Sequence, residues 1–179
     1  YVYLTEDLAQ LKGNRYSKKR NLIHQFQREV VEKNLLKVEP ITPKSVADCL
    51  GFLEKWCEEH DCGSHGEDDL ACEKQALINT IENMAVMEVK GILLRIDNQV
   101  CAMAMAAHLA EEMGALQYQK AFAGIKGLYQ YFDRECARRL FSGYRYINKE
   151  SDMGIPGIAK AKKSYHPDMR IKAHILKLR

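Results

Sequence analysis

Hydrophobic residues recur at helical spacing in the first half of the chain. Residues 1–4 are aromatic and β-branched and predict a short strand, whereas residues 16–31 predict a basic helix. Thr42 is a favoured N-cap residue and stands before Pro43, so the pair predicts the start of a second helix. A third helix is expected over residues 69–84. The predicted inward positions of these helices are Ile23, Phe26 and Val30; Val46, Leu50, Leu53 and Cys57; and Leu70, Leu77, Ile81 and Met84.

The period changes after the third helix, where apolar and alternating runs predict strands. Strands are expected at residues 86–96, 100–109, 116–122, 144–148 and 169–178, with a hairpin turn at 97–99. Helices are expected at 128–141 and 158–164, and the first of these would bury Leu128, Phe132, Cys136 and Leu140. This order predicts an α/β (α+β) fold, in which helices flank a central mixed and mostly antiparallel sheet.

A short internal repeat predicts that the chain descends from a duplicated protein. Residues 1–5, soon followed by Asp7 and Gly13, resemble residues 144–148, soon followed by Asp152 and Gly157. Two prolines, Pro40 and Pro43, mark the expected boundary. We therefore predict a strand-helix remnant of a first domain at 1–38 and a second domain at 39–179. The alternative is a coincidence between two aromatic strands that precede basic helices.

Composition and charge narrow the class of protein. The 179 residues are 46% hydrophobic, which suffices for one sizeable core. A net charge of +3 gives little overall attraction for nucleic acid, although residues 11–28 carry six bases and no acid. The six cysteines are scattered, which fits a reducing cytoplasm, and the longest nearly apolar stretch, 100–110, is too short to span a bilayer. We expect a cytoplasmic protein without a membrane span.

Several motifs resemble one bacterial family, the phosphatidylglycerol lysyltransferase C-terminal-like proteins. The motifs are Leu-Lys-Gly-Asn-Arg-Tyr at 11–16, Lys-Lys-Arg-Asn at 18–21, Ile-Lys-Gly-Leu-Tyr-Gln at 125–130, Tyr-Ile-Asn-Lys-Glu at 146–150 and Gly-Ile-Pro-Gly-Ile-Ala-Lys-Ala-Lys at 154–162. The resemblance extends over essentially the whole chain. It implies tandem Gcn5-related acyltransferase folds, an absent N-terminal domain as a partner, and kinship with enzymes that take aminoacyl groups from aminoacyl-tRNA. The chain differs from lipid-modifying members in showing no membrane portion.

The same resemblance implies a donor site where two strands part before a helix. Amides at a helix start and its positive dipole favour anions, and Gly124, Ile125, Lys126 and Gly127 stand at that position. The alternative is an ordinary strand-to-helix turn. The usual coenzyme A signature is not met, because Lys126 occupies its last small position. A closed sheet, or a helix start plugged by side chains, would remove the transferase hypothesis and leave only the fold.

Acyl transfer also needs groups that accept and donate protons. Glu150 and Asp152 follow the strand at 144–148 and are the predicted acids, and Tyr165 is the predicted proton donor. Each is alternatively a cap, turn former or surface group. Lys160 is predicted to contact a donor phosphate, and Lys18, Lys19 and Arg20 form a better candidate for phosphate or the acceptor end of tRNA.

A metal site is not expected. Cys57, His60, Cys62, His65 and Cys72 offer zinc ligands, but no Cys-x-x-Cys pair occurs and Cys57 falls on a buried stripe. Three functions therefore stay open. They are an acyltransferase that uses an aminoacyl-tRNA donor and an amine or hydroxyl acceptor, an acyl-coenzyme A-dependent N-acetyltransferase of a small amine, and a non-catalytic binding module.

Overall fold

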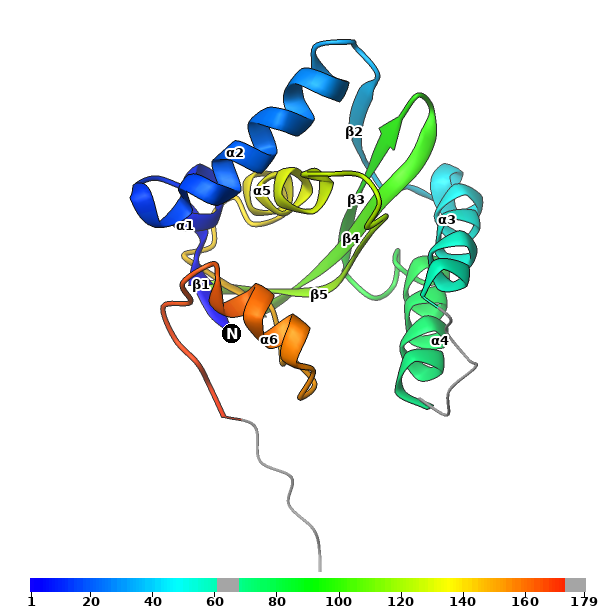
Figure 1. Ribbon diagram of the computed structural model, residues 1–179. Coiled ribbons are helices and arrows are strands. Elements are labelled where there is room, and N and C mark those ends of the chain that lie inside the picture. Colours follow the sequence, from blue (N-terminus) through cyan, green and yellow to red (C-terminus); the bar gives the residue numbers. More distant parts are fainter. Residues whose placement is uncertain (61–67, 173–179) are drawn as a thin grey trace, which may run out of the picture.

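A mixed sheet forms the centre of the computed structural model, which describes residues 1–60 and 68–172 (Figure 1). Among these residues the strand order is β1-β6-β5-β4-β3-β2, and every neighbouring pair is antiparallel except the parallel pair β5 and β6. The strands are β1 (Val2–Leu4), β2 (Leu36–Pro40), β3 (Lys90–Ile96), β4 (Gln99–Ala110), β5 (Met113–Ala121) and β6 (Tyr146–Asn148).

Helices cover both faces of the sheet and give two separate apolar cores (Figure 1). One core joins the sheet to α1, α2 and α5, and the other joins it to α3 and α4. Within the described ranges, no helix is both long and apolar enough to cross a membrane. The helices are α1 (Thr5–Gln10), α2 (Ser17–Phe26) with a π-helical continuation (Gln27–Val31), α3 (Val46–Glu59), α4 (Asp68–Glu82), α5 (Leu128–Leu140) and α6 (Pro156–Lys163).

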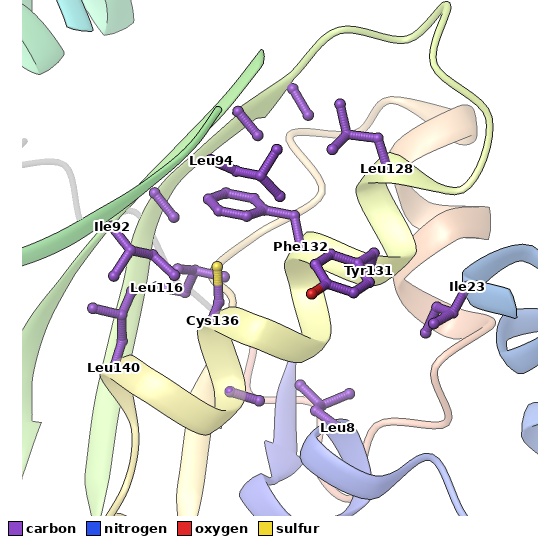
Figure 2. Packing of buried hydrophobic residues seen from close by; sticks show 14 of the residues in the cluster. Leu8, Ile23, Ile92, Leu94, Leu116, Leu128, Tyr131, Phe132, Cys136 and Leu140 are labelled. Atoms are coloured by element: carbon purple, nitrogen blue, oxygen red, sulfur yellow. The ribbon is translucent and has the colours of Figure 1, made fainter. Parts of the chain in front are cut away.

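The inner face of α5 is the one that the sequence predicts. Leu128, Phe132, Cys136 and Leu140 are all buried. Figure 2 shows them among Ile92, Leu94 and Leu116 of the sheet, while Leu8 of α1 and Ile23 of α2 approach α5 from elsewhere. Burying a side chain of this size contributes about 1.5–3 kcal/mol, so this stripe fixes α5 between the sheet and the N-terminal helices.

Three local elements differ from the sequence-based expectations. Strand β2 lies where a domain boundary was expected, and it pairs along its whole length with β3. Helix α1 was not expected. Strand β3 begins at Lys90 and not at residue 86, because the amides of Val86 and Met87 both donate to the Asn83 carbonyl in a turn. That turn leaves the Val86 side chain 80% exposed.

The N-terminal segment shares the sheet and the core with the rest of the chain. Strand β1 pairs with β6 and forms a bridge to Met169, and α1 and α2 pack on α5. A boundary between residues 38 and 39 would cut β2. The origin of residues 1–38 in an earlier copy stays a prediction. Of the expected strand at 169–178, the described part at 169–172 makes only the bridge at Met169, and the part from 173 onward lies outside the described residues.

Candidate functional site

Strands β5 and β6 part soon after they meet. Their parallel pairing consists of Met113 with Tyr146, Gly114 with Ile147 and Ala115 with Asn148. Strand β6 then ends, because the Asn148 side chain accepts the Glu150 amide at 2.8 Å and Glu150 takes a left-handed backbone conformation. Strand β5 continues to Ala121 along β4, so its other edge has no strand partner beyond Ala115. The predicted parting of the sheet is present.

A bulge accompanies this parting. Met105 of β4 pairs with Tyr118 of β5, but the next residue, Ala106, pairs with Leu116. Gln117 is therefore an extra residue on β5 that opposes none on β4. Such bulges bend a strand and increase its local twist, which directs the C-terminal half of β5 away from β6.

Main-chain groups at the end of β5 are bonded to two aromatic side chains. The Ala121 amide donates to the Tyr129 hydroxyl at 3.3 Å, and the Ala121 carbonyl accepts the Trp56 indole N–H at 3.2 Å. Tyr129 belongs to the first turn of α5 and Trp56 to α3. Burial raises the pKa of the Tyr129 hydroxyl, so the phenol stays protonated at neutral pH.

The predicted anion-binding turn at the start of α5 is open at one end and closed at the other. Gly124 has free space around it and Lys126 is exposed. Gly127 is the N-cap of α5 with φ +81°, and a β-carbon there would lie 2.3 Å from the Leu22 carbonyl oxygen. Ile125 is half-buried against the core, and its carbonyl accepts the Leu128 amide at 3.2 Å. The main chain of α2 therefore closes the helix start at Gly127.

A buried ion pair lies between α5 and the end of β6. Lys149 Nζ is 2.5 Å from Asp133 Oδ1, and the two side chains are only 12% and 5% exposed. The Tyr165 hydroxyl also hydrogen-bonds to Asp133. Burial raises the pKa of Tyr165 well above its ordinary value, and the Asp133 charge raises it further. We call these three residues the Asp133 cluster.

Two further lysines surround the Asp133 cluster. Lys19 of α2 lies 4.0 Å from the centre of the Tyr165 ring and donates to Ser164 Oγ at 2.7 Å. Lys162 of α6 donates to the main-chain carbonyls of Lys149 and Ser151. Burial lowers the pKa of both ammonium groups, and the charge of Lys149 lowers both further. Three amino groups are thus gathered around one buried carboxylate.

The predicted catalytic acids lie at the edge of this region. Glu150 is exposed, and its pKa is raised by partial desolvation of the carboxylate, an effect that the nearby Lys162 opposes. Asp152 accepts the Tyr1 hydroxyl at 2.6 Å and the Gly154 amide at 3.1 Å, and the first of these bonds lowers its pKa. Tyr165 differs from both acids in being buried. The structure thus brings Glu150 and Tyr165 close to Lys162 and Lys149, respectively.

The lysines and the arginine that were predicted to bind phosphate lie in different environments. Arg20 donates to the carbonyls of Leu11 and Gly13 at 2.6 and 2.7 Å, so its guanidinium holds the loop before α2. Lys18 and Lys160 are exposed. Lys19, as described above, points toward Tyr165.

Metal ligands do not gather in the part of the chain that the structure describes, where no group of three or more His, Cys, Asp or Glu residues is in place to hold an ion. Cys57 is buried, and the His60 ring stacks on Trp56 with 4.0 Å between centroids. Cys62 and His65 lie outside the described residues, and the Cys72 side chain is likewise not described.

Sequence reasoning missed Asp133, Lys149, Trp56 and Tyr129 as parts of the site. A signal existed for Asp133, because a carboxylate directly after the buried Phe132 is adjacent to the inner face of its helix. Lys149 directly follows a predicted strand in the motif at 146–150. For Trp56 and Tyr129, no local pattern indicates that both reach the same main-chain residue of β5.

Solved structures share this architecture. A conserved protein of unknown function from Bacteroides thetaiotaomicron is 32% identical, with a TM-score of 0.87 over 94% of this chain and 55% of its own. The C-terminal domain of a protein assigned as a lysylphosphatidylglycerol synthetase, from Agrobacterium fabrum, is 14% identical, with a TM-score of 0.64 over 93% and 56% of the respective chains. The chain thus spans about half the length of these two structures.

A shorter structure defines the fold class. The aminoglycoside N-acetyltransferase AAC(6')-Iy, in complex with a bisubstrate analogue, is 8% identical, and the match has a TM-score of 0.52 over 80% of this chain and 98% of that one. At this identity only the fold is shared, and it is the Gcn5-related acyltransferase fold that the family resemblance implied. No curated protein is significantly similar to the chain. The sequence profile of the phosphatidylglycerol lysyltransferase C-terminal family matches residues 1–176, and the chain belongs to this family.

Proposed function

We propose that the chain is the acyl-transferring part of an aminoacyl-tRNA-dependent transferase with an amine or hydroxyl acceptor. Its family and its acyltransferase-like fold support transfer chemistry in general. The observation that carries the proposal is the parting of β5 and β6 beside the Asp133 cluster. The unpaired strand edge lies next to groups that can donate and accept protons, and acyl transfer uses such groups when they are positioned beside the reactants.

The Asp133 cluster and Glu150 supply groups for both proton transfers. Tyr165 keeps its proton at neutral pH because its pKa is raised, so it donates to the oxygen that leaves the donor. Glu150 has a raised pKa and is exposed, so it accepts the proton of the acceptor. The Lys149 ammonium orients Asp133, which in turn holds the Tyr165 hydroxyl.

Basic segments beside the cluster fit a nucleic-acid donor. Lys19 on α2 bonds to Ser164 just after α6, and the Tyr16 hydroxyl donates to the Tyr165 carbonyl at 3.1 Å. The start of the basic helix α2 therefore lies beside the C-terminal end of α6. Lys18 and Lys160 are exposed on these two helices and would contact phosphates near the acceptor end of tRNA. A cytoplasmic location, where aminoacyl-tRNA is found, belongs to this proposal.

A coenzyme A-dependent N-acetyltransferase is the second candidate, and the fold favours it because AAC(6')-Iy shares the architecture. The start of α5 argues against it. Gly127 has no room for a bound phosphate on the side of α2, and Lys126 replaces the last small residue of the usual signature. With Gly127 closed, the donor proposal depends on the parted strands and not on the predicted turn. A non-catalytic module with this fold is the third candidate.

Calorimetric titration separates the three candidates. An aminoacylated acceptor-stem mimic should bind, and acetyl-coenzyme A should not. Lys19→Ala should weaken binding of the mimic at least about fivefold, because it removes one half-buried cation, whereas Lys44→Ala on the far side of the sheet should leave it unchanged. Lys126→Ala tests whether the exposed end of the predicted turn contributes.

The outcomes are distinct. Binding of acetyl-coenzyme A alone would replace the proposal by the N-acetyltransferase, and binding of neither ligand would favour the module. Because the chain spans about half the length of similar structures, the same titrations belong on a parent protein that includes the proposed N-terminal acyltransferase-like domain. Transfer to an acceptor should be measured on that longer protein.

A further inference from the structure

At the end of β5, Ala121 directs both of its main-chain groups toward the parted side. Ala121 stands opposite Ala102 of β4, and the next amide, that of Phe122, donates to the Cys101 carbonyl of β4 at 3.1 Å. In an antiparallel ladder, alternate residues direct their N–H and C=O groups to opposite edges. The N–H and C=O of Ala121 therefore face the edge that β6 leaves free.

Both groups of Ala121 are already bonded by side chains of the same chain. Tyr129 accepts the amide, and Trp56 donates to the carbonyl. The three residues satisfy one another. We call Trp56 and Tyr129 the Ala121 caps.

Neighbouring groups hold Trp56 in place. The His60 ring stacks on the indole at 4.0 Å, and Lys120 Nζ lies 4.2 Å from the indole centroid. Lys120 is buried and forms an ion pair of 2.8 Å with Glu73 of α4. The Trp56 cap is thus fixed by groups from α3, α4 and β5, and it is not a loosely placed surface ring.

An extended ligand with secondary amides binds a free strand edge by exchanging N–H and C=O hydrogen bonds with it. The pantetheine arm of an acyl thioester donor is such a ligand. We propose that Trp56 and Tyr129 determine donor specificity by capping Ala121, so that the chain rejects pantetheine thioesters and accepts acyl donors that do not pair with β5. The inference rests on the proposed function in one respect: the donor that the chain accepts is taken to be a nucleotide ester, the aminoacyl-tRNA.

The test uses pantetheine itself as the probe. Pantetheine has no phosphates, so the closed start of α5 does not influence its binding. The double variant Trp56→Phe and Tyr129→Phe keeps an aromatic ring at each position but frees the Ala121 amide and carbonyl. Pantetheine binding, followed by NMR titration, should be at least about tenfold tighter in the double variant than in the native chain, since two hydrogen bonds become available. Tyr131→Phe, a hydroxyl deletion two residues along α5, should leave the weak native binding unchanged.

A second readout reports on the caps directly. Hydrogen exchange of the Ala121 amide should accelerate about tenfold or more in Tyr129→Phe alone, and this variant serves if the double variant does not fold. Native binding of pantetheine with a shifted Ala121 amide would overturn the inference. So would equal pantetheine binding by native and double-variant chains. Neither result depends on aminoacyl-tRNA, so failure of the proposed function would be seen separately, in the titrations with the acceptor-stem mimic.

Discussion

Gly127 lets α2 approach the start of α5 more closely than a residue with a side chain would allow. Its φ is +81°, and a β-carbon at this position would lie 2.3 Å from the Leu22 carbonyl oxygen and 3.0 Å from Phe26 Cβ. The carbonyl belongs to the main chain of α2, so relief would require movement of that helix. Gly127→Ala is therefore predicted to destabilise the packing of α2 on α5.

The magnitude follows from two costs. A left-handed conformation costs an alanine about 1–2 kcal/mol, and overpacking of a closed contact costs about 1–3 kcal/mol. The lower entropy of the unfolded alanine chain offsets about 0.4–1 kcal/mol. We expect a net loss of about 3 kcal/mol in the free energy of unfolding.

Urea unfolding measures this loss, and Gly124→Ala is the matched control. Gly124 lies three residues earlier, its φ is not positive, and a β-carbon there would meet no atom within 4 Å. Its substitution should change the unfolding free energy by less than about 1 kcal/mol. Equal unfolding midpoints for the two variants would refute the close approach of α2 to the start of α5.

Three further results are expected. Lys149→Met should lower the free energy of unfolding in urea by about 3 kcal/mol, because it leaves the Asp133 carboxylate buried without its cation. Addition of Asp133→Leu should recover most of that loss. A smaller loss in the single variant than in the double variant would contradict the buried ion pair. Arg20→Ala should accelerate tryptic or chymotryptic cleavage of the loop at 11–13, because it removes the hydrogen bonds from the guanidinium to two carbonyls of that loop, whereas Lys18→Ala should not. Equal cleavage rates for the two variants would show that these hydrogen bonds do not hold the loop. Burial raises the pKa of the Cys49 thiol to about 11 from 9.0, so the folded state binds its proton more tightly. The stability that this group contributes should be complete below about pH 9 and fall as the pH rises toward 11. Iodoacetamide should label Cys49 far more slowly in the folded chain at pH 8 than in urea, as peptide mass mapping would detect.

Much of the fold follows from local pattern. The buried stripe of α5 is confirmed because its apolar residues recur at one helical period with charged residues elsewhere on the helix. Strand β2 was missed although Lys37 and Glu39 alternate with apolar residues as in a strand, because Pro40 and Pro43 favour a domain boundary there. Its identity as a strand comes from β3, which is distant in sequence and supplies all of its ladder partners.

The candidate site was less accessible to sequence reasoning, because its contacts join distant segments. The residues Glu150 and Tyr165 could be chosen from their positions after a strand and a helix. The ion pair of Lys149 with Asp133 depends on where α5 lies relative to β6, and no local periodicity encodes that placement. Closure of Gly127 depends likewise on α2, which packs there from more than a hundred positions earlier in the chain.

The pairing of β1 with β6 has a consequence for biosynthesis. A ribosome makes the first strand long before it makes residues 146–148, with which that strand bonds. Until then the early segment has no neighbour within the sheet, and α1 and α2 lack the surface of α5. The domain should therefore complete its folding only after nearly all of it has been released from the exit tunnel, and contacts of such wide separation favour slow folding.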